Sequence, residues 1–324
     1  MISTRELTKD FVVNRTETVH AVRGISLDVE PGELVAVLGP NGAGKTTTLR
    51  MLTTLIAPTS GTAKVAGYDV TADPSLVRRQ IGYVGQGNGA GHSQRVRDEL
   101  VGQGVIYGLD SRSAKKRADE LLDSLELVDL ANRKVSDLSG GQRRRLDVAM
   151  GLVHAPGLLF LDEPSTGLDP QNRANLWDHI LRMREQYSMT IMLTTHYLDE
   201  ADSMAERVVV VDHGEVIADD TADALKAELA GDQLILTVAP GNLARTAELA
   251  KQLPGAKDVV VDGDQLTLRV ADGPAALPEL IAASQRSAIP VATAQVRRPT
   301  LDDVFLNLTG RSLREADSTG KAAA

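Results

Sequence analysis

Short apolar runs alternate with longer amphipathic stretches over roughly the first 225 residues of the chain. The apolar runs are nearly continuous, which is typical of strands buried on both faces of a parallel sheet. The amphipathic stretches have the length and period of helices that cover such a sheet. The pattern therefore predicts an α/β domain with a largely parallel sheet. Its central strands are predicted at residues 34–38, 158–161, 190–194 and 207–211.

One part of this domain lacks strand-like runs. Between residues 94 and 155 the apolar positions recur at helical spacing instead. Because no strand interrupts them, we expect the helices there to form a subdomain inserted into the α/β domain, at about residues 88–155. The predicted helices are residues 96–107, 114–125 and 141–153.

A second domain is predicted after a helix at residues 222–229. Strand and helix patterns then follow in the order βαββαβ, which is the order of a small ferredoxin-like α+β domain. We therefore expect an α/β domain at residues 1–230, an accessory domain at residues 231–312 and a frayed polar tail at residues 313–324. The accessory strands are predicted at residues 234–238, 258–261, 265–270 and 291–296, and its helices at residues 243–253 and 275–287.

The composition excludes several classes of function for this chain. The chain of 324 residues has 35 Lys and Arg against 44 Asp and Glu, and only 3% of its residues are aromatic. Because nucleic-acid surfaces are normally basic and often stack aromatic rings on bases, we expect no nucleic-acid partner. Cysteine is absent, which excludes disulfides and thiolate metal sites. No apolar run reaches the ~18 residues of a membrane span and no secretory signal is evident, so we expect a cytoplasmic protein.

The clearest chemical motif follows the strand predicted at residues 34–38. It matches G-x-x-x-x-G-K-[ST] and stands between a strand and a helix predicted at residues 46–55, the context of a phosphate-binding loop. The loop amides can surround the β- and γ-phosphates of ATP, Lys45 adds positive charge, and the Thr46 hydroxyl can bind Mg²⁺. A glycine-rich turn without a ligand is the structural alternative. The predicted nucleotide contacts are Gly39, Pro40, Asn41, Gly42, Ala43, Gly44, Lys45, Thr46 and Thr47.

Two adjacent carboxylates end another predicted strand. Because ligands bind at the carboxyl ends of parallel strands, Asp162 is expected to hold Mg²⁺ beside the phosphate loop. Glu163 follows directly and can act as the general base on an attacking water. Alone, such a pair is more often a helix cap or part of an ion pair. The phosphate loop in the same domain favours the catalytic interpretation.

A third motif, Leu138-Ser139-Gly140-Gly141-Gln142, ends 20 residues before Asp162. Its serine hydroxyl and glycine amides stand at the start of a predicted helix, where an anion can bind. With this motif, the sequence resembles the nucleotide-binding subunits of ABC transporters over about residues 7–229, because LSGGQ is their signature. The resemblance implies a P-loop ABC ATPase domain with an inserted helical subdomain, and it implies nucleotide contacts by Ser139, Gly140, Gly141 and Gln142.

The resemblance implies roles for four further residues. Gln86 matches the Q-loop glutamine, which contacts Mg²⁺ or water, and Asp169 matches the D-loop aspartate at the subunit interface. His196 matches the switch histidine at the γ-phosphate, and Phe11 is the candidate for the ring that stacks on adenine. We interpret the arginines at 143–145 as a solvated and interdomain helix face. The remaining histidines, interpreted as core or surface residues, are His20, His92, His154, His179 and His213.

In the resembled family, the signature of one subunit binds the γ-phosphate held by the other. This implies a homodimer that closes on ATP and opens after hydrolysis, bound to separate polytopic permease subunits at the cytoplasmic face of the membrane. Residues 298–310 also resemble the end of daunorubicin-resistance-type ATPases, which implies export of a drug or antibiotic. For the accessory domain, regulation or dimer stabilisation and simple packing remain equal alternatives.

Three alternatives stay open. A non-transport ABC ATPase or an exporter of lipid or other cargo would carry the same motifs. A phosphate-loop kinase would share residues 39–46, but it would not need the signature at residues 138–142. The kinase would label a second substrate, whereas an ATPase releases free phosphate.

Overall fold

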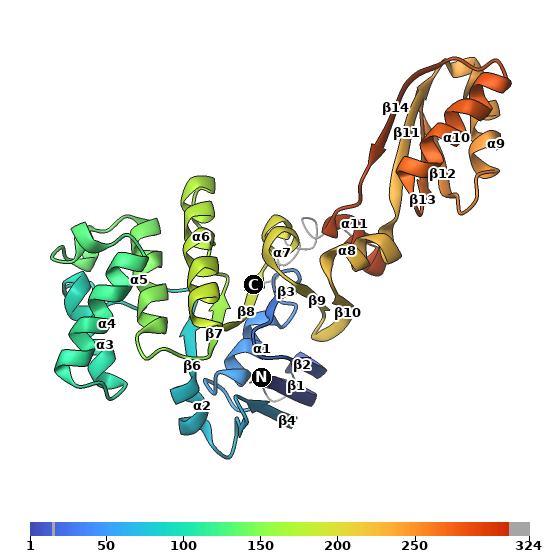
Figure 1. Ribbon diagram of the computed structural model, residues 1–324. Coiled ribbons are helices and arrows are strands. Elements are labelled where there is room, and N and C mark those ends of the chain that lie inside the picture. The colour runs from blue at the N-terminus through green and yellow to red at the C-terminus, as the bar shows by residue number, and fades with distance from the viewer. Residues whose placement is uncertain (15–16, 311–324) are drawn as a thin grey trace. The chain divides into compact units, whose positions relative to one another are not determined.

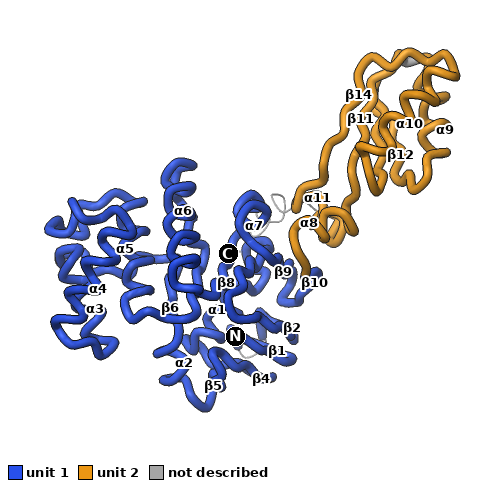
Figure 2. Tube along the Cα trace, viewed as in Figure 1, with its two compact units in different colours: residues 1–219 blue, residues 220–324 orange. Residues whose placement is uncertain are grey.

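The computed structural model describes residues 1–14 and 17–310. The chain divides into two compact units, residues 1–219 and 220–324 (Figure 2). The predicted tail at residues 313–324 lies outside the described residues, as does the end of the accessory domain predicted at 231–312. None of the helices within the described ranges is long and apolar enough to cross a membrane.

The first unit is built on a six-stranded sheet of order β10-β9-β3-β8-β7-β6. The strand β3 pairs in parallel with both β8 and β9, and β7 pairs in parallel with both β6 and β8. Every residue of β3, β7 and β8 is buried, as their continuous apolar runs predicted. The strands are β3 (Leu34–Leu38), β6 (Ile81–Val84), β7 (Leu158–Asp162), β8 (Thr190–Thr195), β9 (Arg207–Asp212) and β10 (Glu215–Asp220).

A second sheet of the same unit, of order β2-β1-β4-β5, was not predicted. Its pairs β1–β2, β1–β4 and β4–β5 are antiparallel, so the domain is less uniformly parallel than the apolar runs indicated. Side chains of both sheets pack around α1 in one core. The strands are β1 (Ile2–Asn14), β2 (Glu17–Val29), β4 (Ser60–Val65) and β5 (Tyr68–Asp69).

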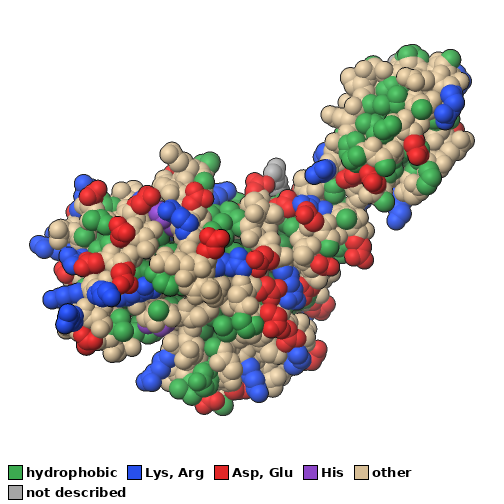
Figure 3. All heavy atoms as spheres, viewed as in Figure 1, with side chains coloured by type: hydrophobic (Ala, Val, Ile, Leu, Met, Phe, Trp, Pro, Cys, Tyr) green, Lys and Arg blue, Asp and Glu red, His purple; other side chains and the backbone are tan. Residues whose placement is uncertain are grey.

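The predicted helical subdomain is present as α3, α4 and α5, which Figure 1 shows gathered beside the β6–β7 end of the sheet. The helices of the unit are α1 (Lys45–Leu52), α2 (Pro74–Gln80), α3 (Val96–Ile106), α4 (Ser111–Ser124), α5 (Gly140–Leu152), α6 (Pro170–Tyr187) and α7 (Leu198–Met204). Acidic and basic side chains intermingle on the face of this unit seen in Figure 3. The α/β class with an inserted helical segment is confirmed.

The second unit contains the predicted βαββαβ order, with the sheet order β12-β13-β11-β14 of a ferredoxin-like domain. One face of the sheet packs on α9 and α10 through a core that includes Leu234, Leu236 and Leu268. The elements are α8 (Ala222–Leu225), β11 (Asp232–Val238), α9 (Leu243–Lys251), β12 (Lys257–Asp262), β13 (Gln265–Val270), α10 (Gly273–Arg286), β14 (Val291–Arg297) and α11 (Leu301–Thr309).

Candidate nucleotide-binding site

The phosphate loop joins the end of β3 to the start of α1. Gly44, just before α1, has a φ of 103°, a left-handed conformation that glycine adopts without a Cβ clash. At Gly39, a Cβ would lie 2.1 Å from the carbonyl oxygen of Val211 on β9. The glycines of the motif therefore let the loop take this turn and fit closely against the neighbouring strand.

The loop surrounds the Lys45 side chain, which is only 4% exposed. Its ammonium donates hydrogen bonds to the carbonyl oxygens of Gly39 and Pro40, at 2.6 and 3.0 Å. It also lies 3.7 Å from Oε1 of Glu163. A buried ammonium held among loop carbonyls and one carboxylate can exchange these partners for an anionic phosphate.

The hydroxyl of Thr46 connects two more of the predicted residues. It donates to Oδ1 of Asp162 at 2.8 Å and accepts from the Gln86 amide at 3.1 Å. A second hydroxyl, of Thr194 on β8, donates to the same carboxylate oxygen at 2.8 Å. The other oxygen, Oδ2, is buried without a hydrogen-bond partner among the described residues. A hydroxyl, a carboxylate with a free oxygen and an amide are donors that Mg²⁺ accepts, so these residues fit the ion.

Glu163 stands directly after β7 with a φ of 47°, a left-handed conformation uncommon for this residue type. Its Oε2 lies 3.2 Å from Nδ1 of His196 and accepts a hydrogen bond from the Thr166 hydroxyl at 3.1 Å. Burial alone would raise the pKa of the Glu163 carboxyl, but His196 and the charge of Lys45 outweigh burial and lower the pKa. Glu163 is therefore held ionised, as a general base must be.

A cavity of about 590 Å³ lies over the phosphate loop. Nine predicted site residues line it: Asn41, Gly42, Ala43, Gly44, Lys45, Thr46, Thr47, Gln86 and Glu163. Phe11 is not among the lining residues. Its ring is 41% exposed on β1, with the Lys9 ammonium 5.2 Å from the ring centre. Its cross-strand partner Val19 does line the cavity, so the hairpin reaches the site through β2.

Comparison with known proteins agrees with a nucleotide site. Residues 22–166 match the ABC transporter family, and residues 221–309 match the C-terminal domain of DrrA1-3-like ATP-binding proteins. The chain is 43% identical to the daunorubicin resistance ATP-binding protein DrrA3 of Streptomyces coeruleorubidus, over 96% of this chain and 98% of that protein. The chain belongs to the ABC transporter ATP-binding proteins. The resemblance inferred from the motifs is thereby confirmed.

Two further ABC proteins extend the comparison. Nod factor export ATP-binding protein I of Paraburkholderia xenovorans (strain LB400) is 37% identical, over 91% of this chain and 93% of that protein. The dimeric structure of an ATP-binding cassette bound to ADP and Pi is 26% identical, with a TM-score of 0.63 over 68% of this chain and 98% of that one. The ABC ATPase fold is therefore established, and nucleotide binding with ATP hydrolysis is the activity expected of it.

The ABC signature lies away from this cavity, and none of its residues lines it within the described part of the chain. Ser139 caps α5: its hydroxyl accepts from the amide of Gln142 at 3.3 Å, and the Gln142 side chain accepts from the amide of Ser139 at 3.0 Å. Gly140 and Gly141 form the first turn of the helix. Asp169 likewise caps α6 and accepts from the Asn172 amide at 3.0 Å. These residues stand at helix starts, where backbone amides are available to an anion.

The sequence missed several residues that line the cavity: Thr18, Val19, His20, Ala21, Arg23 and His213. His213 is linked to the site because the amide of Gly214 donates to the carbonyl of Ala43 at 2.9 Å, and the amide of Arg23 donates to the carbonyl of Gly214 at 2.8 Å. No spacing along the chain indicates this connection. Interpreting His20 and His213 as ordinary surface residues leaves out their position at the nucleotide site.

The interpretation of residues 143–145 as a solvated and interdomain face was wrong in its solvated part for Arg144, which is 8% exposed and bonds to Gly85 and Pro164. A helix turns its residues by about 100° each, so three consecutive side chains cannot share one face.

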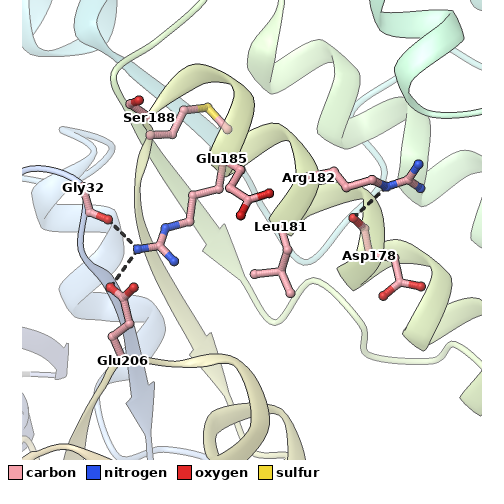
Figure 4. A pocket seen from close by; sticks show the side chains of 9 residues that line it. Gly32, Asp178, Leu181, Arg182, Glu185, Ser188 and Glu206 are labelled. Carbon is pink, nitrogen blue, oxygen red and sulfur yellow. Dashed lines mark hydrogen bonds and ion pairs between the residues drawn. The ribbon is translucent and has the colours of Figure 1, made fainter.

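A second cavity, of about 830 Å³, lies along α6 (Figure 4). There Arg184 donates to the carbonyl of Gly32 at 2.5 Å and to the carboxylate of Glu206 at 2.7 Å. This cavity has no phosphate loop. The chemistry of the lining, and not the volume, identifies the ABC nucleotide site.

Proposed function

We propose that the chain binds and hydrolyses Mg²⁺-ATP as the energy-coupling subunit of an ABC exporter. The observation that carries this proposal is the meeting of three features at one loop: the Lys45 ammonium, the Thr46–Asp162 hydrogen bond and the ionised Glu163 carboxylate. Each supplies a different need of phosphoryl transfer, namely charge, metal ligands and a base.

The residues divide the chemistry among them. The Lys45 ammonium and the loop amides between Gly39 and Thr47, except that of Pro40, bind the phosphates. Thr46, Asp162 and Gln86 would hold Mg²⁺, which would supply positive charge to the bound phosphates. Glu163 accepts the proton of the attacking water, and His196, 3.2 Å from Glu163, orients that carboxylate and reaches the γ-phosphate. We keep Phe11 as the proposed adenine-stacking residue, although only its cross-strand partner Val19 lines the cavity.

We propose that a second copy completes each site. Ser139, Gly140, Gly141, Gln142 and Asp169 present helix starts that contribute nothing to their own chain's cavity. In a two-fold dimer, these groups would face the γ-phosphate held by the other copy. Hydrolysis removes that phosphate, so the dimer closes on ATP and opens afterwards.

The proposed partners are polytopic permease subunits that hold the chain peripherally at the cytoplasmic face of the membrane. Drug or antibiotic export is supported by the near full-length similarity to DrrA3 and by the match of residues 221–309. The Nod factor relative indicates that cargo differs within the family, so lipid or other cargo is the alternative. A non-transport ABC ATPase is the second alternative.

The proposed domains divide this work. ATP chemistry belongs to residues 1–230, and movement toward the permease to the helical subdomain at residues 88–155. Residues 231–312 form an accessory domain without a cluster of metal-binding side chains among its described residues.

The test uses the tagged variant Glu163→Gln, which should bind ATP without hydrolysing it. The variant is expressed in its native host and extracted from membranes with mild detergent in the presence of ATP and Mg²⁺. A trapped ATP dimer should copurify with a polytopic membrane protein. Lys45→Ala, with the same tag, is the matched control and should bind no nucleotide. Recovery of Glu163→Gln only as a free dimer would reject the transporter. Phosphate label on a second substrate, instead of free phosphate, would reject the ATPase.

A further inference from the structure

The middle arginine of the signature helix is buried, and within the described residues its hydrogen bonds go to backbone carbonyls. Nε of Arg144 donates to the carbonyl of Pro164 at 2.5 Å, and Nη1 donates to the carbonyl of Gly85 at 2.6 Å. Pro164 follows Glu163 and Gly85 precedes Gln86. One side chain of α5 is therefore bonded beside the proposed base and beside a proposed metal ligand.

Further contacts place the guanidinium next to the backbone of Asp162 and Glu163. Nη2 of Arg144 lies 3.4 Å from the carbonyl oxygens of Asp162 and Glu163. The left-handed φ of Glu163 is unfavourable for a non-glycine residue, and such a turn persists only where its surroundings hold it. The planar guanidinium has donors in a fixed arrangement, so it holds several carbonyls in one geometry.

A buried carboxylate stands one helical turn further along α5. Asp147 is 5% exposed, and its Oδ1 accepts from the amide of Gly89 at 2.9 Å. Arg144 thus holds the segment around Gln86 at its start, and Asp147 holds it at its end. Both anchors belong to the same helix, which begins at the signature serine.

We infer that Arg144 and Asp147 form a two-point clamp through which the signature helix sets the positions of Gln86 and Glu163. They are positioning residues, because each acts through the backbone of a neighbouring segment. The inference rests on the proposed function, since it assigns a role relative to the proposed base. It also makes a structural claim that does not depend on hydrolysis.

The test exploits the run of three arginines. Arg144→Lys keeps the charge but loses the forked donor, so it cannot reach Pro164 and Gly85 together. Arg143→Lys and Arg145→Lys are matched controls on the same helix, because neither side chain contacts the Gln86 or Glu163 segment: Arg143 donates to the carbonyl of Val135, and Arg145 contacts the Glu126 carboxylate and the His179 ring on α6. We expect Arg144→Lys to lower kcat for ATP at least tenfold with KM within about threefold, and both controls to stay within about twofold of wild type in kcat.

Two additional comparisons separate positioning from general damage. Asp147→Ala should slow hydrolysis, and Asp147→Asn should restore most of the rate, because its amide oxygen can still accept from Gly89. In the Glu163→Gln background, Arg144→Lys should lower the residual rate by a smaller factor than in wild type, since one of the two groups through which it acts is gone. Equal fold-losses in both backgrounds would overturn the proposal, as would a rate for Arg144→Lys equal to that of the controls.

Hydrogen exchange without nucleotide tests the clamp independently of catalysis. Arg144→Lys should raise amide exchange at residues 85–90 and 162–166 at least fivefold, while Arg143→Lys leaves both segments unchanged. Unchanged exchange in Arg144→Lys would overturn the clamp even if ATP hydrolysis is confirmed. Raised exchange in a protein that does not hydrolyse ATP would retain the clamp and reject the proposed function.

Discussion

The hydroxyl of Thr46 offers a direct test of the site, because a single atom joins the phosphate loop to the proposed metal ligands. Thr46→Val replaces this hydroxyl by a methyl group of similar size. It removes the 2.8 Å hydrogen bond to Asp162 and the 3.1 Å bond from Gln86. Asp162 keeps the hydrogen bond from Thr194, so its Oδ1 is not left without a partner.

These contacts set the expected loss of stability. A hydrogen bond to a charged group contributes about 1.5–3 kcal/mol, and the bond to exposed Gln86 adds little. Because the Thr194 hydroxyl still donates to the Asp162 carboxylate, we expect Thr46→Val to lower the free energy of unfolding by about 2 kcal/mol. For a unit of this size, each kcal/mol corresponds to about 2–4 °C, so Tm should fall by about 4–8 °C. Thr46→Ser keeps the hydroxyl and should lose much less.

The assay is thermal unfolding followed by circular dichroism, first without ligand and then with a non-hydrolysable ATP analogue, with and without Mg²⁺. In wild type, ligand at 100 times its Kd adds about 2.7 kcal/mol, and part of this gain should require Mg²⁺. Thr46→Val should keep the nucleotide-dependent gain and lose the Mg²⁺-dependent part. A variant with wild-type Tm and a full response to Mg²⁺ would refute both the hydrogen-bond argument and the metal assignment.

Three further outcomes are expected. Glu163→Gln should lower kcat by about 10²–10⁴-fold while nucleotide still binds, as phosphate release and isothermal calorimetry would measure; unimpaired release would reject the base. Gly39→Ala should abolish nucleotide binding in calorimetry, because its Cβ would meet the Val211 carbonyl at 2.1 Å; normal affinity would contradict the close fit. Burial of Glu206 raises its pKa, but hydrogen bonds from Arg184 and the Leu34 amide outweigh this and lower the pKa below that of an ordinary glutamate. The stabilisation by its ionised form is therefore complete above the ordinary glutamate pKa and is lost as the pH falls through the lowered pKa, so urea unfolding should show a smaller loss of stability in acid for Glu206→Gln than for wild type; an identical loss would contradict the sign.

The four central strands of the six-stranded sheet, β9, β3, β8 and β7, could be predicted because burial on both faces demands continuous apolar runs, whereas the outer strands β6 and β10 were not predicted. The antiparallel sheet could not, because β1 and β2 are half exposed and their pairing contains register shifts, as between Lys9 and Asp10. Such shifts interrupt the alternation of apolar and polar positions that identifies a strand. In β1, residues 8–14 contain no buried side chain, so the pattern there resembles a loop.

In the candidate site, too, some residues could be predicted from the sequence and others could not. Residues 39–46 and 162–163 could be predicted because phosphate and metal chemistry requires those residue types at strand ends. His213 could not, since it reaches the cavity through hydrogen bonds of Gly214 with Ala43 and Arg23, far away in sequence. Tertiary packing of this kind leaves no periodic signal along the chain.

The signature helix α5 connects the signature serine with the turn that carries Glu163. Ser139 caps its start, and Arg144 follows five residues later, about 7.5 Å along the axis at 1.5 Å per residue. A helix is stiff over this length, so a displacement of its start also moves Arg144 and the carbonyls of Pro164 and Gly85 bonded to it. If a second copy's γ-phosphate engages Ser139, the same movement acts on Glu163 of the first chain. The arrival of nucleotide at one site and the positioning of the base at the other are then one mechanical event, and a single chain would bind ATP without hydrolysing it efficiently.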